Sequence, residues 1–181
     1  MLGFLCKIWY KYVMGWKLSG PHPNAVKKKI LIVVPHTSGW DLSTGLVAKY
    51  SIGLKVKFVG KKSLFNGPKK YFFYMLGLLP IDRSNGKSAV EGIIKLFNSR
   101  EELTIGMAPE GTRKKVKKFK SGFYRIAKTL GIPIVMVKLD YANRMITFSD
   151  PYFLNKSKQE DISYIENYFR GVIGKVPEYS F

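Results

Sequence analysis

Segments with the pattern of β-strands alternate along this chain with segments that have the helical period, and this alternation constrains the fold more than any other feature. The apolar run at residues 30–34, Ile-Leu-Ile-Val-Val, predicts a buried strand. Apolar residues at helical spacing within residues 87–98 predict a helix with Val90, Ile93, Ile94 and Phe97 in the core. We therefore expect an α/β fold, a single domain with a central, mostly parallel or mixed sheet flanked by helices.

The other expected elements follow the same alternation. Further strands are predicted at residues 55–59, 77–83, 103–108, 132–137 and 144–148. Further helices are predicted at residues 42–50, 68–76, 122–130 and 162–169, with Gly131 ending the third of these. Residues 109–120 form a polar loop in this assignment. No repeat or linker divides the chain of 181 residues, which is long enough for one sizeable core.

Charge is the outlying property of the composition. The chain carries 31 Lys and Arg against 12 Asp and Glu, a net charge of +19. A protein this basic is expected to meet anionic partners, which are nucleic acid, an anionic membrane surface, or acidic substrates and carriers. One cysteine, Cys6, excludes an intrachain disulfide, and with only His22 and His36 beside it a Cys/His zinc site is not expected.

The first 18 residues are rich in aromatic and apolar side chains, with lysines spaced among them. Charges interrupt this stretch well before the ~20 apolar residues that a membrane span needs. Trp9, Tyr10, Tyr12 and Trp16 are side chains that favour a membrane interface, so we expect an amphipathic membrane-docking segment over residues 1–20. The alternative is a helix packed on the core of the protein itself.

A histidine and an aspartate follow the first buried strand. His36 stands where that strand ends, and Asp41 lies five residues later, where a helix is expected to begin. A carboxylate beside an imidazole fixes its tautomer and stabilises the imidazolium, which is what a general base needs to take a proton from a hydroxyl. The alternative is a loop histidine with a helix-capping aspartate.

Two more strands are followed by residues suited to anions. Arg83 ends one of them, and Pro109-Glu110-Gly111-Thr112-Arg113 follows another. Arginine matches a phosphate or carboxylate with two donors, and glycine with a hydroxyl completes an anion cradle. Sites in α/β folds gather at the carboxyl ends of strands, so these loops are expected on one rim with His36. Lys114, Lys115, Lys117, Lys118 and Lys120 follow directly and would focus negative ligands there.

Taken together, these blocks resemble the glycerophospholipid acyltransferases, the family of 1-acylglycerol-3-phosphate acyltransferases and lysophospholipid acyltransferases. The resemblance covers over half the chain and lies in four blocks in the family's order. The blocks are H-x-x-x-x-D at His36 and Asp41, a glycine-led strand ending in the basic Arg83, P-E-G-T-R at residues 109–113, and an apolar run with proline at residues 132–135.

The resemblance implies an acyltransferase with a fold like that of the glycerol-3-phosphate acyltransferases, over residues 21–181. In it, His36 is the general base and Asp41 its partner, while Arg83, Glu110, Gly111, Thr112 and Arg113 position the phosphate of the acceptor. Since a carboxylate does not bind an anion directly, Glu110 is expected to orient the arginines or a hydroxyl. The acyl donor is acyl-CoA or acyl carrier protein, the acceptor is 1-acylglycerol-3-phosphate or a related lysolipid, and neither a metal nor a bound cofactor is implied.

A peripheral or monotopic association with the cytoplasmic side of a membrane is expected, with an anionic membrane surface as a partner. Two other functions are compatible with the sequence. A basic nucleic-acid-binding module would explain the charge but not the His-Asp pair or P-E-G-T-R, and no recognition signature for DNA or RNA is present, so nucleic acid is not expected as a partner. The second alternative function is that of a catalytically idle lipid-binding relative.

Overall fold

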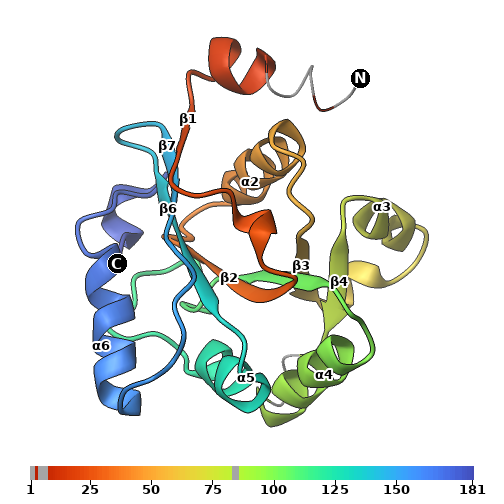
Figure 1. Ribbon diagram of the computed structural model, residues 1–181. Coiled ribbons are helices and arrows are strands. Elements are labelled where there is room, and N and C mark those ends of the chain that lie inside the picture. Colours follow the sequence, from red (N-terminus) through yellow and green to blue (C-terminus); the bar gives the residue numbers. More distant parts are fainter. Residues whose placement is uncertain (1–2, 4–7, 83–85) are drawn as a thin grey trace.

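One mixed β-sheet forms the centre of the molecule (Figure 1). The computed structural model describes residue 3, residues 8–82 and residues 86–181. Within these residues seven strands form the sheet in the order β1-β7-β6-β2-β5-β3-β4. All neighbouring pairs are parallel except β6 and β7. The strands are β1 (Lys17–Ser19), β2 (Lys28–Val34), β3 (Lys57–Lys61), β4 (Leu78–Ile81), β5 (Leu103–Met107), β6 (Ile134–Asp140) and β7 (Met145–Phe148).

Helices cover both faces of the sheet, which confirms the predicted α/β class (Figure 1). Ile30, Ile32 and Val34 point to the face covered by α4, α5 and α6, whereas Leu31 and Val33 point to the face covered by α2. The helices are α2 (Trp40–Ser51), α3 (Lys69–Met75), α4 (Gly86–Asn98), α5 (Gly122–Leu130) and α6 (Lys158–Phe169), with short turns η1 (Trp9–Val13), η2 (Pro23–Ala25), η3 (Lys62–Phe65) and η4 (Pro177–Tyr179).

Local sequence signals explain where several helices begin and end. Helix α5 ends at Gly131, whose φ of +62° is the left-handed conformation that glycine adopts without strain. Helix α6 begins with a capping box, in which the Ser157 hydroxyl accepts from Glu160 N–H and the Glu160 carboxylate accepts from Ser157 N–H. Val90, Ile93 and Phe97 of α4 are buried, as their spacing predicts, while Ile94 is half-buried and packs against the same core.

The N-terminal segment differs in part from the expected interfacial helix. Residues 1–2 and 4–7, with Cys6 among them, lie outside the described residues. Trp9 is 56% exposed, but Tyr10 and Trp16 are buried against the face that α2 covers. Residues 17–19, assigned to the docking segment from the sequence, pair with β7 as strand β1. In the described part of the chain, no helix has the length and apolar character needed to cross a bilayer. Membrane docking by this segment stays a prediction.

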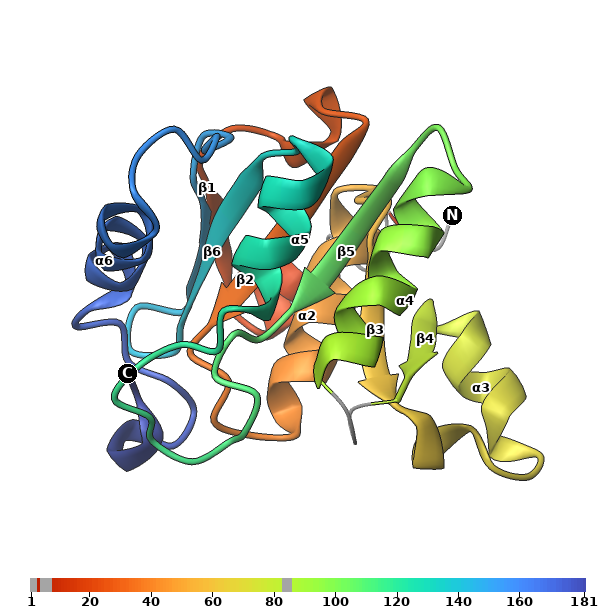
Figure 2. The ribbon, with the colours of Figure 1, turned by 90° about the horizontal axis from the view of Figure 1, so that it is seen from below.

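The loops that follow the parallel strands gather at one end of the sheet. Strands β2, β5 and β3 run parallel, so the residues after Val34, Met107 and Lys61 lie at the same edge (Figure 2). This edge carries His36, the Pro109–Lys120 loop and η3, and it is the end of an α/β sheet where ligands bind.

Candidate active site

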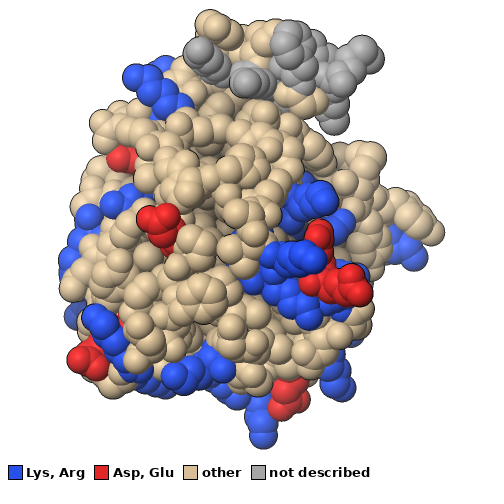
Figure 3. Space-filling view, in the orientation of Figure 1, with Lys and Arg blue, Asp and Glu red and all other residues tan. Residues whose placement is uncertain are grey.

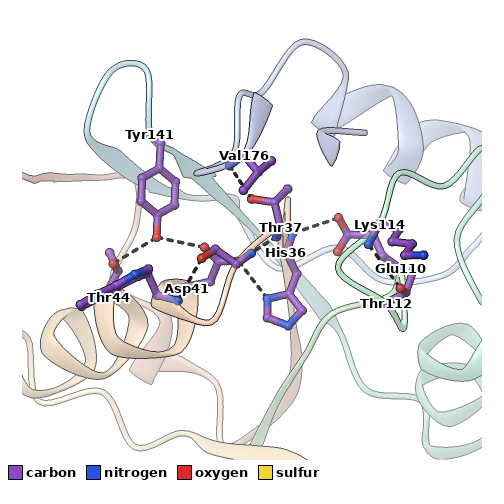
Figure 4. A network of polar contacts seen from close by, with 11 residues as sticks. His36, Thr37, Asp41, Thr44, Glu110, Thr112, Lys114, Tyr141 and Val176 are labelled. Atoms are coloured by element: carbon purple, nitrogen blue, oxygen red, sulfur yellow. Dashed lines mark hydrogen bonds and ion pairs between the residues drawn. The ribbon is translucent and has the colours of Figure 1, made fainter. Parts of the chain in front are cut away.

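The turn between β2 and α2 brings His36 and Asp41 together (Figure 4). Strand β2 ends at Val34, a cis peptide bond leads into Pro35, and α2 begins at Trp40 with Asp41 in its first turn. His36 Nδ1 lies 3.0 Å from Asp41 Oδ2. Because a carboxylate only accepts, this contact places the proton on Nδ1 and leaves Nε2 with a lone pair.

Four donors hold the Asp41 carboxylate in place. Oδ2 also accepts from the backbone N–H groups of Thr37 and Ser38, both at 2.8 Å. Oδ1 accepts from the Tyr141 hydroxyl at 2.9 Å. The Asp41 side chain is 4% exposed, while the His36 side chain is 30% exposed. The carboxylate is therefore buried and fixed, and the imidazole that it orients reaches the surface.

Tyr141 is a member of the site that sequence reasoning missed. It follows β6 directly, its hydroxyl lies 3.2 Å from Thr44 Oγ1, and its ring packs edge-on against Trp16 with centroids 4.9 Å apart. Burial raises the pKa of the Tyr141 hydroxyl above its usual range, so it remains a donor. No local pattern marks Tyr141, because its nearness to Asp41 depends on the pairing of β6 with β2 in the sheet.

Glu110 joins the second loop to the first. Its Oε1 accepts from the backbone N–H of His36 at 2.9 Å, and its Oε2 has no hydrogen-bond partner among the described residues. Glu110 is 3% exposed, and burial raises the pKa of its carboxyl to about 7 against the lowering effect of the His36 N–H. The expectation was that Glu110 orients arginines or a hydroxyl. The contact found is with the backbone of His36.

The start of the loop at residues 109–120 packs against its last residue, Lys120. Lys120 N–H donates to Pro109 O at 2.9 Å, which closes the loop. Gly111 has a φ of +66°, and a Cβ there would lie 2.8 Å from Lys120 Nζ, so the lysine stem lies directly over the glycine. A Cβ at Gly39 would lie 3.7 Å from an Arg113 guanidinium nitrogen, so the arginine stands beside the start of α2.

Residues 174–176 contact the loop that carries His36 through Thr37. The backbone N–H of Val176 donates to Thr37 Oγ1 at 3.1 Å (Figure 4). Gly174 packs so closely that a Cβ there would lie 2.6 Å from Thr37 Cγ2. The loop that carries His36 is therefore held by α2, by Glu110 and by residues near 175.

A cavity of about 720 Å³ opens beside this network, within the usual size of a ligand site. His36 and Asp41 line it, and so do Gly111, Thr112 and Arg113. Two more cations stand on the wall, Lys120, which was expected to focus anions there, and Arg125, which sequence reasoning did not assign. Of the predicted site residues, only Arg83 lies outside the described residues, while Glu110 lies behind the wall, against the His36 backbone.

These features define an α/β protein with an oriented imidazole at the rim of a cation-lined cavity. The Acyltransferase family model matches residues 16–140, more than half of the chain. The protein belongs to the Acyltransferase family, as the resemblance indicated.

Two known proteins are similar to this chain. A Brassica napus protein, "1-acyl-sn-glycerol-3-phosphate acyltransferase BAT2, chloroplastic", is 28% identical over 125 residues, covering 66% of this chain. The match spans 35% of that relative, about a third of its length. The crystal structure of the 1-acyl-sn-glycerophosphate (LPA) acyltransferase, PlsC, from Thermotoga maritima superposes with a TM-score of 0.59. It covers 92% of this chain and 76% of the other at 17% identity, which supports the fold.

Proposed function

We propose that this protein transfers a fatty acyl group from a thioester, acyl-CoA or acyl carrier protein, to a hydroxyl of 1-acylglycerol-3-phosphate or a related lysolipid. The observation that carries the proposal is the His36–Asp41 contact at the cavity wall, with the P-E-G-T-R loop bonded to the backbone of the same histidine. Membership of the Acyltransferase family and the similarity to a plant 1-acyl-sn-glycerol-3-phosphate acyltransferase support the same chemistry.

In the proposed reaction, His36 Nε2 takes the proton of the acceptor hydroxyl while Asp41 stabilises the imidazolium through Nδ1–H. The acceptor oxygen attacks the thioester carbon, the C–S bond breaks, and the leaving thiolate takes the proton from Nε2. No acyl-enzyme forms, and no metal or bound cofactor takes part. A general base contributes ~10²–10⁴-fold, so positioning of the two substrates in the cavity supplies much of the remaining rate.

The charged and apolar parts of the cavity suit the two ends of such substrates. Gly111, Thr112 and Arg113, together with Arg83, are proposed to hold the acceptor phosphate, and the cations of Lys120 and Arg125 stand on the same wall. On the α2 side of the sheet, the wall is apolar and suits an acyl chain. Its residues there include Leu31, Val33, Gly45, Leu54 and Phe58.

Free-thiol release from acyl-CoA and from acyl carrier protein, measured with a panel of lysolipids, tests the proposal. His36→Ala is expected to abolish acceptor-dependent release while the fold, followed by circular dichroism, is unchanged. The matched control is His22→Ala, because His22 is exposed and is absent from the cavity wall. Full turnover by His36→Ala would end the mechanism. If no combination of acyl donor and lysolipid releases thiol, although the protein is folded and binds liposomes, the result would instead indicate a catalytically idle lipid-binding relative.

A further inference from the structure

An acid-free stretch of the chain surrounds α3. Between Asp41 and Asp82 the sequence holds no Asp or Glu. The same 40 residues hold seven lysines, at positions 49, 55, 57, 61, 62, 69 and 70. A net positive segment of this length attracts anionic surfaces by simple Coulomb forces, and Lys61, Lys62 and Lys69 are exposed to exert them.

Large apolar side chains are exposed on the same segment. In the described part of the chain, α3 is a helix with no buried residue. Tyr71 is 69% exposed, Phe72 54% and Met75 70%, and Leu64 of η3 and Tyr74 are 42% and 45% exposed. We call Leu64, Tyr71, Phe72, Tyr74 and Met75, with Lys61, Lys62, Lys69 and Lys70, the α3 surface. Clustered apolar exposure of this kind marks an interaction site.

Aromatic packing between η3 and α3 holds the α3 surface in place. Phe65 is the buried residue of η3, and its ring packs against Phe73 and Tyr74 with centroids 5.7 Å and 5.1 Å apart. These aromatic contacts attach η3 and α3 to each other and leave the opposite side of α3 facing out. In Figure 2, α3 projects beside β4 from one end of the sheet, and in Figure 3 the corresponding right-hand edge is tan bordered by blue.

The α3 surface lies next to the candidate active site. Helix η3 follows the carboxyl end of β3, at the edge of the sheet that carries His36. Lys61 and Leu64 also line the cavity that His36 and Asp41 line. A lipid bound at the α3 surface would therefore have an apolar wall leading from η3 toward the imidazole.

We propose that the α3 surface docks the protein on an anionic lipid bilayer, separately from the N-terminal segment. Aromatic rings sit at the level of the lipid headgroups, lysine stems lie along apolar surface with their ammonium groups in water, and lysines are attracted to anionic lipid. A projecting helix with outward rings also suits a deformable bilayer better than the rigid pocket of a protein partner. The inference goes beyond acyl transfer and does not require His36 to be catalytic.

Vesicle flotation with the whole chain tests the proposal. The triple variant Tyr71→Ser/Phe72→Ser/Met75→Ser is expected to bind phosphatidylcholine vesicles containing about 30% phosphatidylglycerol about tenfold or more weakly than the unaltered protein. The matched control removes three apolar side chains that are exposed elsewhere, Phe153, Ile173 and Tyr179, by the same change to serine. Equal loss in both triple variants, or no loss in the first, would overturn the proposal.

A site-specific probe separates this surface from the N-terminal segment. Met75→Cys in a Cys6→Ser background, labelled with a polarity-sensitive fluorophore, is expected to brighten on anionic vesicles, and high salt should weaken the response. An unchanged signal on vesicles that the protein does bind would assign docking to other residues. A response to acyl carrier protein without one to vesicles would assign the surface to an acidic protein and refute the lipid.

Failure of this proposal is distinguishable from failure of the proposed function. With a water-soluble short-chain acceptor, the triple variant is expected to release thiol at the rate of the unaltered protein, because Tyr71, Phe72 and Met75 are absent from the cavity wall. Loss of vesicle binding with this rate retained supports a docking role. Loss of both together would mean that the substitutions disturb the site, and the docking role would be withdrawn.

Discussion

Replacing Glu110 by glutamine tests how the protein tolerates a buried carboxyl group beside its histidine. The glutamine side chain keeps an oxygen to accept the His36 N–H but carries no titratable proton. The pKa of the Glu110 carboxyl is raised from 4.5 to about 7, mainly by burial, so the folded state favours the protonated form. The substitution should therefore change how stability depends on pH, in addition to any change in stability itself.

The sign and size follow from linkage between protonation and folding. Because the folded pKa lies above the unfolded one, the stabilisation is complete below pH 4.5 and is lost as the pH rises through 7. At ~1.4 kcal/mol for each pKa unit, the full loss is ~3 kcal/mol. Between pH 5 and pH 8 the loss is ~2.5 kcal/mol, because part of the stabilisation has already been lost at pH 5.

Urea unfolding at pH 5, 6, 7 and 8 measures this directly. The unaltered protein should lose ~2.5 kcal/mol more than Glu110→Gln between pH 5 and pH 8, because the substitution removes the titration of this carboxyl group. Glu101→Gln, at an exposed glutamate, is the control and should follow the unaltered protein. A free-energy difference between the unaltered protein and Glu110→Gln that is the same at every pH would refute the reasoning.

Three further predictions concern the site. Asp41→Asn should lower turnover by about 10²-fold or more with unchanged circular dichroism, because His36 loses the carboxylate that stabilises its imidazolium; normal turnover in the thiol assay would contradict this. Tyr141→Phe should lower kcat several-fold without changing KM, because Asp41 loses a donor that fixes its orientation. It should also move the acid limb of the pH–rate profile to higher pH, because the Asp41 carboxylate then interacts more strongly with the imidazolium. A change in KM alone would indicate a merely structural tyrosine. Arg113→Ala should raise KM for the phosphate-bearing acceptor and leave KM for the acyl donor unchanged; a fall in kcat at constant KM would contradict a binding role.

Elements with strong local signals were predicted well from the sequence. Helix α5 was predicted with the bounds Gly122–Leu130, because the helical period and a left-handed glycine both act within a few residues. Strand β6 was predicted to begin at residue 132 but begins at Ile134. Strand β1 was missed, because three residues carry no period and Lys17–Ser19 is a strand only through its pairing with β7. Such pairing over more than a hundred residues leaves no local pattern.

In the candidate site, too, the features set by local sequence were predictable and the contacts between distant residues were not. The His36–Asp41 contact was predictable, since the strand end and the helix start that flank it are both local features. Tyr141 was not, because it meets Asp41 across 100 residues. The Glu110 contact joins a carboxylate to a backbone N–H, and a backbone group has no signature in the sequence.

The bond between Val176 and Thr37 also has a consequence for how the protein is made on the ribosome. The two partners are 139 residues apart, so Thr37 is synthesised long before the residue that supports it. At ~5–20 residues per second, the delay is roughly 7–30 s, plus the time residue 176 needs to leave the exit tunnel. Until residue 176 emerges, the nascent chain thus carries His36 and Asp41 on a loop that lacks its hydrogen bond to Val176. Completion of this loop therefore waits for residue 176 to emerge from the ribosome and is not set by emergence of His36 and Asp41.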